Sequence, residues 1–225
     1  MIQLVVDSTA AVPQDFLEKH ANVHVIPLFI SVKGEYVPEY EASIEQVIDY
    51  SESTKKAVPT SQPSTGDFLK MFETIPKEDP IIVICITSGV SGTYNGAVLA
   101  ARQSGRKNIT VINSRTTAIG MMEVLEDALD FIDQGLSFEE ISKALMKSAE
   151  NMRTTFTVDT LDYLRRGGRI GKAAGLIGSI LKIKPVIFLN DKNEVDVLAK
   201  VRTSKKATAA MIDYLHANSP CKRIG

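Results

Sequence analysis

The sequence contains only two cysteines, Cys85 and Cys221, and it contains no long apolar run. Two cysteines are too few for a disulfide framework, so a reducing compartment is expected. None of the apolar runs approaches the roughly 18 residues that a transmembrane helix requires. The amino terminus is too short and becomes acidic too early to be a signal peptide. These absences predict a cytoplasmic protein with no stable membrane insertion.

The composition is that of an ordinary globular protein, with 44% hydrophobic and 24% charged residues in a chain of 225. The net charge is only −1, but the charges are unevenly distributed. Residues 1–164 contain 13 Lys and Arg against 23 Asp and Glu, whereas residues 165–206 contain 11 against 3. The second segment therefore either presents a basic surface to an anionic partner or complements the acidic part of the same chain.

Apolar β-rich runs alternate with helical periodicity through the first two thirds of the chain. Strands are predicted at residues 2–6, 23–26, 29–32, 81–86 and 109–112, and helices at 63–72, 93–103 and 116–132. This alternation is typical of an α/β fold, with a mainly parallel sheet and helices on both of its faces.

The pattern changes near residue 153. A short extended piece and a short helix lead to two predicted strands, 183–189 and 194–201, and to a helix at 204–216. We therefore predict two α/β domains, residues 1–153 and 154–225. The second domain is predicted to be incomplete, because its third strand only begins near residue 222.

Polar side chains cluster where the predicted strands end. The clusters are Asp7-Ser8-Thr9, Thr60-Ser61, Thr87-Ser88 with Ser91-Gly92-Thr93, and Asn113-Ser114. In a parallel sheet these carboxyl ends meet along one crevice, where open α/β sheets bind ligands. The clusters near residues 60–63 and 91–93 are also expected to open helices, where hydroxyls and unpaired N–H groups favour an anion. The alternative is that these Ser and Thr residues are only helix N-caps.

The same crevice contains little that could carry out a reaction. The three histidines lack metal-ligand spacing, no Walker A or G-x-G-x-x-G motif is present, and no His is placed to act as a base for Ser91. Neutral hydrogen-bond donors without a nucleophile, metal or nucleotide cradle are better suited to holding an anion than to transforming it. No cofactor is expected.

Several motifs, in order along nearly the whole chain, resemble those of the DegV family. They are Asp7-Ser8-Thr9-Ala10, Thr60-Ser61-Gln62-Pro63-Ser64, Ser88-Gly89-Val90-Ser91-Gly92-Thr93-Tyr94, Leu161-Asp162-Tyr163-Leu164 with Gly167-Gly168-Arg169-Ile170, Lys184-Pro185 and Val201-Arg202-Thr203. The resemblance implies two α/β domains with a long-chain fatty acid in a tunnel between them. It also implies that the hydroxyls of Thr60 and Ser91 grip the carboxylate, with Ser61, Gly92 and Thr93 adjacent.

The resemblance further implies a partner, the catalytic protein of a fatty acid kinase, which converts the bound fatty acid to an acyl phosphate for phospholipid synthesis. Arg202 and Arg169 are implied to lie near the carboxylate and the kinase-facing surface. Family members have further C-terminal chain with a His near the carboxylate, and this sequence lacks that part. The apolar side chains of residues 171–181 either line the tunnel or pack a helix closely, namely Leu176, Ile177, Ile180 and Leu181.

Three other functions are alternatives to a fatty-acid carrier. A phosphotransfer enzyme related to dihydroxyacetone kinase is the main alternative, but it needs a nucleotide site. A hydrolase needs a base for Ser91. A nucleic-acid-binding role could use the basic segment 165–206, but that segment has no helix-turn-helix pattern. The sequence therefore favours a lipid-binding carrier over an enzyme, with no nucleic acid as partner.

Overall fold

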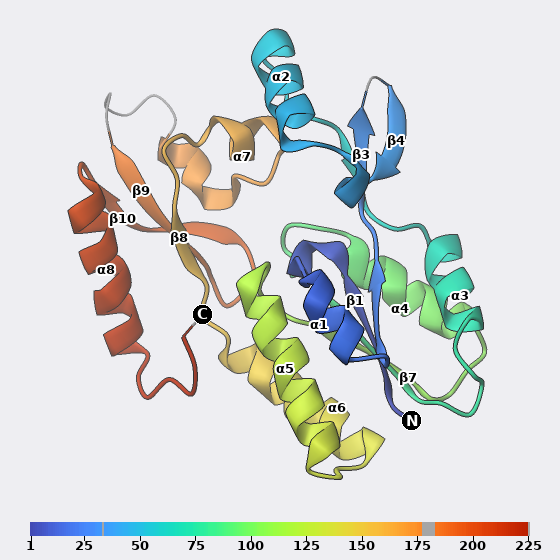
Figure 1. Ribbon diagram of the computed structural model, residues 1–225. Coiled ribbons are helices and arrows are strands. Elements are labelled where there is room, and N and C mark those ends of the chain that lie inside the picture. The colour runs from blue at the N-terminus through green and yellow to red at the C-terminus, as the bar shows by residue number, and fades with distance from the viewer. Residues whose placement is uncertain (33, 177–182, 225) are drawn as a thin grey trace.

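The centre of the molecule is a four-stranded parallel sheet (Figure 1). The computed structural model describes residues 1–32, 34–176 and 183–224. The strand order is β2-β1-β6-β7, formed by β1 (Gln3–Asp7), β2 (Val23–Ile26), β6 (Ile81–Cys85) and β7 (Ile109–Asn113). All three pairings are parallel, so the four carboxyl ends lie along one edge, as predicted.

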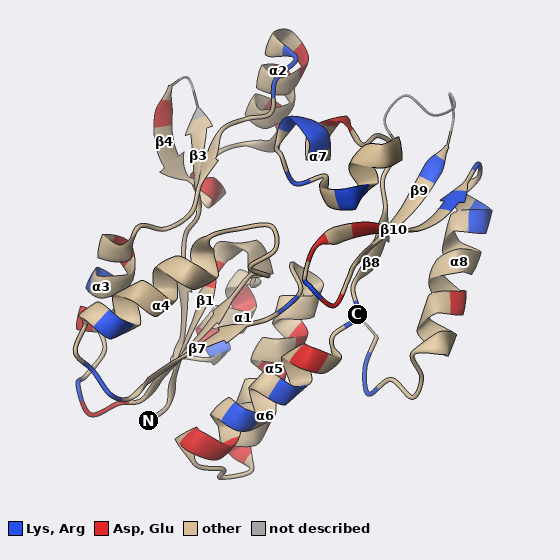
Figure 2. Cartoon of the chain, turned by 180° about the vertical axis from the view of Figure 1, so that it is seen from behind, with Lys and Arg blue, Asp and Glu red and all other residues tan. Residues whose placement is uncertain are grey.

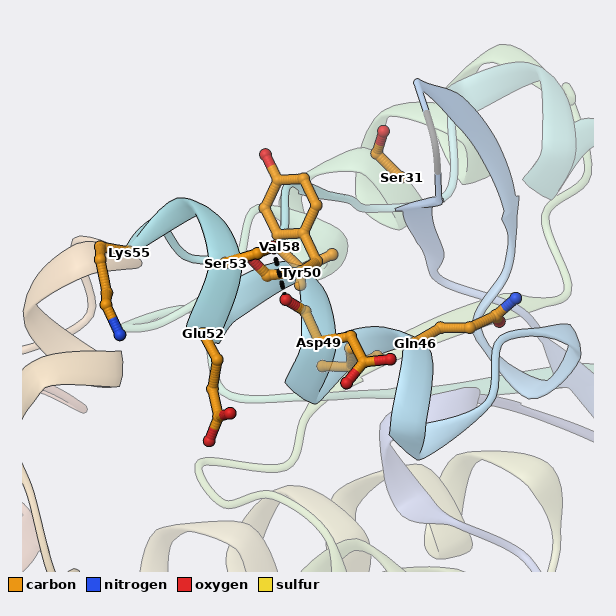
Figure 3. Close-up of a pocket in the computed structure, with 9 residues that line it drawn as sticks. Ser31, Gln46, Asp49, Tyr50, Glu52, Ser53, Lys55 and Val58 are labelled. Atoms are coloured by element: carbon orange, nitrogen blue, oxygen red, sulfur yellow. Dashed lines mark hydrogen bonds between the residues drawn. The ribbon is translucent and has the colours of Figure 1, made fainter.

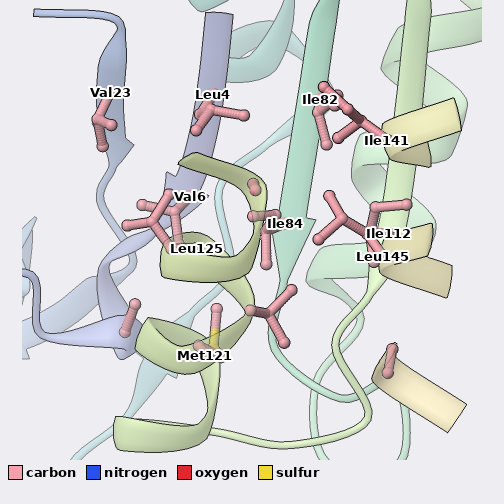
Figure 4. Close-up of a cluster of buried hydrophobic side chains, with 14 of the residues drawn as sticks. Leu4, Val6, Val23, Ile82, Ile84, Ile112, Met121, Leu125, Ile141 and Leu145 are labelled. Carbon is pink, nitrogen blue, oxygen red and sulfur yellow. The ribbon is translucent and has the colours of Figure 1, made fainter. Parts of the chain in front are cut away.

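Helices cover both faces of this sheet, which confirms the predicted α/β fold class. Leu4 and Val6 of β1 point to the face covered by α1 (Gln14–Lys19), α5 (Ile119–Asp133) and α6 (Phe138–Asn151). Val5 points to the opposite face, which is covered by α3 (Thr65–Glu73) and α4 (Thr93–Gln103). Side chains alternate along a strand, so a fully apolar strand such as β6 can supply both cores. Figure 4 shows the first core, in which side chains of α5 and α6 pack onto β1, β6 and β7.

A second sheet is small and antiparallel, with the order β4-β3-β5. It consists of β3 (Phe29–Val32), β4 (Glu35–Pro38) and β5 (Thr60–Ser61). Between β4 and β5 the chain forms η2 (Glu39–Glu41) and α2 (Ile44–Thr54), which projects from the body of the molecule (Figure 1). A capping box formed by Ser43 and Gln46 opens α2.

A third sheet has the order β10-β9-β8 and is also antiparallel. Its strands are β8 (Thr155–Thr157), β9 (Lys184–Leu189) and β10 (Val195–Val201), and it is accompanied by α7 (Asp162–Arg166), η3 (Gly171–Leu176) and α8 (Ser204–Ala217). The division into two domains at residue 153 stays a prediction. In Figure 2 the ribbon is blue, marking Lys and Arg residues, on α7 and near the ends of β9 and β10, where the basic segment lies.

The prediction of a strand beginning near residue 222 is wrong, because residues 222–224 have no strand structure. Instead, the Arg223 guanidinium makes ion pairs at 2.7–3.4 Å with acidic side chains of α5, namely Glu123, Glu126, Asp127 and Asp130. In the described part of the chain, no helix combines the length and the apolar composition needed to cross a membrane.

Candidate functional site

The amino terminus of α4 lies just after β6, at the carboxyl edge of the parallel sheet. Its N-cap is Gly92, which has no side chain to cap the helix, and the first turn has no acidic residue. The N–H groups of Tyr94 and Asn95 have no hydrogen-bond partner among the described residues. By contrast, α2, α3 and α6 each begin with a capping box, in which the N-cap Ser side chain accepts the N–H of the third helical residue. The start of α4 therefore keeps backbone donors and the positive end of the helix dipole available to an anion.

Two hydroxyl groups flank this helix end. Ser91 Oγ lies 2.9 Å from Thr93 Oγ1, and the Thr93 N–H donates to Ser91 Oγ at 3.4 Å. Thr93 is fully buried, whereas Ser91 is partly exposed. Only one hydroxyl of the pair needs to donate to the other, so the pair retains one O–H donor for a ligand. The structure thus brings the predicted residues Ser91, Gly92 and Thr93 together as a donor cluster.

The prediction that Thr60 and Ser61 follow a strand of the parallel sheet and open a helix is wrong. They form the edge strand β5, which pairs antiparallel with β3 through Thr60 opposite Ile30 and Ser61 opposite Phe29. They therefore do not follow a parallel strand, and they do not open a helix. The next helix, α3, begins later because the Ser64 hydroxyl and the Asp67 carboxylate form its capping box. Both Thr60 and Ser61 are exposed.

The side chain of Gln62 connects this strand to α4. A Cβ atom on Gly92 would lie 2.1 Å from Gln62 Oε1, and one on Gly96 would lie 3.1 Å from Gln62 Nε2. The carboxamide therefore occupies the space that these two glycines leave on α4. This contact places the segment that carries Thr60 and Ser61 beside the segment that carries Ser91 and Thr93.

Residues 87–93, here called the β6–α4 loop, also contact the third sheet. A Cβ atom on Gly89 would lie 1.6 Å from the backbone oxygen of Asn193, in the turn between β9 and β10. Arg115 reaches the same turn, since its Nε donates to Asn193 Oδ1 at 3.0 Å and its Nη2 to the Asp191 carbonyl at 2.5 Å. Within the parallel sheet, the Asn113 amide at the end of β7 donates to Ser88 Oγ of the β6–α4 loop at 2.8 Å. We call the two hydrogen bonds that Arg115 donates to Asn193 and Asp191 the Arg115 latch.

An apolar cavity of about 210 Å³ lies between the β6–α4 loop and the third sheet. Arg169 borders it, and its Nε donates to the Val90 carbonyl at 3.2 Å, next to Ser91. Leu176 is buried, whereas Ile177, Ile180 and Leu181 lie outside the described residues. The lining residues are Thr87, Val90, Thr117, Phe156, Leu164, Arg169, Leu189 and Val195.

Arg202 lies apart from these residues. It follows the last residue of β10, whereas the β9–β10 turn that touches Gly89 precedes the first. At about 3.3 Å per residue, the two ends of this strand are roughly 20 Å apart. Arg202 is exposed, and no described hydrogen bond or ion pair joins it to the other candidate residues. Of the two predicted arginines, the structure brings only Arg169 to the β6–α4 loop.

The first polar cluster, Asp7-Ser8-Thr9, begins at the last residue of β1 and contacts Ile86, the residue that follows β6. The buried Asp7 carboxylate accepts the N–H of Ile86 at 2.6 Å and the N–H of Thr9 at 3.1 Å. Burial raises the pKa of Asp7 above its usual value, although its hydrogen bonds with Thr9 and Ile86 oppose this shift. The Ser8 hydroxyl accepts the N–H of Leu28 at 2.8 Å.

A larger cavity, of about 660 Å³, lies between α2 and β3 (Figure 3). Its lining includes the charged side chains of Asp49, Glu52 and Lys55 together with the phenol ring of Tyr50. It contains none of the predicted site residues. A negatively charged wall of this kind disfavours a carboxylate ligand, so we place the candidate site at the β6–α4 loop.

The sequence does not predict that Gln62, Arg115 or Asn193 belongs to the site. The signal that could have identified their positions is the glycine content of the β6–α4 loop. A glycine is required wherever another chain segment approaches the backbone closely, as Asn193 does at Gly89 and Gln62 does at Gly92. The sequence alone does not say which segment makes that approach.

A parallel sheet, helices on both faces and hydrogen-bond donors gathered at its carboxyl edge define an α/β protein of the ligand-binding type. The family model described as "Uncharacterised protein, DegV family" matches residues 1–224. The chain belongs to the DegV family.

Relatives of known name support this membership. A DegV domain-containing protein of Staphylococcus aureus is 36% identical over 214 residues, which cover 94% of this chain and 74% of that protein. Protein DegV of Bacillus subtilis is 32% identical over 217 residues, covering 95% of this chain and 76% of that one.

Solved structures show the same fold. A structure described as fatty acid binding of a DegV family protein from Thermus thermophilus has a TM-score of 0.87 at 29% identity, covering 96% of this chain and 77% of that one. The structure of DegV from Bacillus subtilis, described as a fatty acid binding protein, has a TM-score of 0.80 at 32% identity, covering 96% of this chain and 77% of that one.

Proposed function

We propose that this protein binds one long-chain fatty acid, with the carboxylate at the start of α4 and the acyl chain between the β6–α4 loop and the third sheet. The carboxylate would accept hydrogen bonds from Ser91 or Thr93 and from the first-turn N–H groups of α4. Thr60 and Ser61 approach from β5, and Arg169 adds positive charge beside Val90.

The observation that carries this proposal is the uncapped start of α4. Two of its first-turn N–H groups have no partner among the described residues, and its hydroxyls are paired with each other. Val90, the residue before Ser91, lines an apolar cavity. A fatty acid has this combination of properties, because it joins one anionic group to a long apolar chain. Structural relatives described as fatty acid binding proteins support the same ligand class.

The energetic requirements are consistent with such a ligand. Burial of a chain contributes about 0.8 kcal/mol per methylene, so a long acyl chain gains on the order of 10 kcal/mol before ordering costs. A buried carboxylate without hydrogen bonds would cancel much of this gain. The donors at α4 would remove that penalty.

Lipid content tests the proposal directly. Native mass spectrometry of the purified full-length chain, followed by denaturing lipid extraction, should detect about one fatty acid per chain, as expected for a single site at one helix terminus. Added oleate should raise the melting temperature of delipidated protein, because a ligand that binds only the folded state stabilises it. Extracts without fatty acid, together with no thermal shift, would refute fatty acid binding.

We further propose that a separate kinase transfers a phosphoryl group to the bound carboxylate, and that the acyl phosphate enters phospholipid synthesis. The basic segment would face the kinase and its nucleotide phosphates. The purified protein alone should form no acyl phosphate from ATP and fatty acid. If it does, the alternative of a phosphotransfer enzyme related to dihydroxyacetone kinase is correct instead.

A further inference from the structure

Asp7 connects two strands at the carboxyl edge of the parallel sheet. It is the last residue of the inner strand β1, and its side chain is fully buried. One carboxylate oxygen accepts the N–H of Ile86 at 2.6 Å, and the other accepts the N–H and the hydroxyl of Thr9 at 3.1 and 2.5 Å. Ile86 is the first residue after β6. Asp7 therefore fixes the path of the chain as it enters the β6–α4 loop.

Ser8 fixes a different segment. Its hydroxyl accepts the N–H of Leu28 at 2.8 Å, immediately before β3 begins. The strand β3 is the one that pairs with β5, placing Phe29 opposite Ser61 and Ile30 opposite Thr60. Ser8 therefore anchors the start of the strand against which Thr60 and Ser61 are aligned.

Two adjacent residues thus hold the two segments that carry the candidate hydroxyl donors. Asp7 acts on the segment with Ser91 and Thr93, and Ser8 acts on the segment with Thr60 and Ser61. The two segments meet again where Gln62 packs against Gly92. We propose that Asp7 and Ser8 are positioning residues of the carboxylate site, which set the separation of its two groups of donors. This inference rests on the proposed function.

Head-group selectivity provides the test. Lauric acid and 1-dodecanol share an acyl chain and differ in the head group, so the ratio of their dissociation constants reports the carboxylate site separately from the chain cavity. In Asp7→Asn the new NH₂ group faces one of the donors that the carboxylate accepts, and the preference for the acid should fall about tenfold. In Ser8→Ala the Leu28 N–H loses its acceptor, and the preference should fall about threefold.

A purely structural role would not change this ratio. Loss of folded protein weakens the apparent binding of both ligands by the same factor. Asp79→Asn is the matched control, because Asp79 accepts hydrogen bonds from the amino terminus and Gln3 at the opposite end of the sheet. This variant should lose stability and keep the preference. Ser8→Thr retains the hydroxyl and should restore the preference that Ser8→Ala loses.

The outcomes separate the two proposals. An unchanged ratio in folded Asp7→Asn and Ser8→Ala would overturn the positioning roles and leave fatty acid binding intact. Wild-type protein that binds neither ligand, or shows no preference for the acid, would overturn both proposals. If Asp7→Asn does not fold, Thr9→Val replaces it, since it removes one donor to Asp7 and should reduce the preference by about threefold.

Discussion

The hydroxyls of Ser91 and Thr93 differ in their freedom to reach a ligand. Thr93 is fully buried and hydrogen-bonded to Ser91, whereas Ser91 is partly exposed. Thr60 is exposed on an edge strand and has no described side-chain hydrogen bond. Neither Thr60 nor Ser91 caps a helix in the way that Ser64 caps α3. Their hydroxyls are therefore available for binding, in contrast to that of Ser64.

Replacing both Thr60 and Ser91 with Ala should weaken fatty acid binding by at least about tenfold, since each charge-assisted hydrogen bond is worth roughly 1.5–3 kcal/mol. The fold should persist, because neither side chain belongs to a core or a cap. Ser64→Ala is the matched control, expected to cost about 1 kcal/mol of stability without changing affinity. Titration with a fluorescent fatty acid, alongside thermal unfolding, measures both quantities. Equal affinity in the double variant and the wild type would contradict the assignment of these residues.

At the scale of elements, the β6–α4 loop is constrained by its close contact with the turn between β9 and β10. A Cβ atom on Gly89 would lie 1.6 Å from a backbone oxygen, which has no freedom to rotate away as a side chain does. Gly89→Ala should therefore push the turn between β9 and β10 away and cost about 1–3 kcal/mol of unfolding free energy.

Gly66 offers the control for this substitution. It lies in α3, where a Cβ atom would meet only Ser64 Oγ at an ordinary 3.5 Å. Gly66→Ala should leave stability unchanged or raise it by up to about 1 kcal/mol, because Ala favours helix. Urea unfolding of both variants checks the prediction, and equal effects would show that the close approach at Gly89 carries no strain.

The parallel sheet could be predicted because its strands are continuous β-branched runs, and the helices between them keep a clear apolar periodicity. The position of Thr60 and Ser61 could not be predicted. They pair with β3, thirty residues earlier in the chain, and a two-residue edge strand has too little pattern to be detected. The helix predicted at 63–72 begins two residues too early, because Pro63 suits a first helical turn. In the structure the capping box at Ser64 makes Thr65 the first residue of α3.

At the scale of the whole molecule, basic residues are concentrated in residues 165–206, and Arg202 lies in this segment. Since it is remote from the β6–α4 loop, Arg202→Ala should leave fatty acid affinity within about twofold of wild type, as expected for a distant exposed residue. Loss of its charge should reduce kinase-supported acyl phosphate formation more strongly, because nucleotide and acyl phosphates are anionic. Parallel titrations and coupled turnover assays compare the two effects. Intact turnover would remove Arg202 from the kinase-facing surface.

The Arg115 latch, together with the contact at Gly89, joins the parallel sheet to the third sheet on one side of the apolar cavity. In the proposed complex an acyl chain would lie between these two sheets, so the contacts that join the sheets would slow its release. Arg115→Ala should accelerate uptake and release together, with release measured by stopped-flow transfer to albumin, and should change the equilibrium affinity little. For the proposed carrier, the time for which the fatty acid is retained before transfer would therefore depend on the Arg115 guanidinium group.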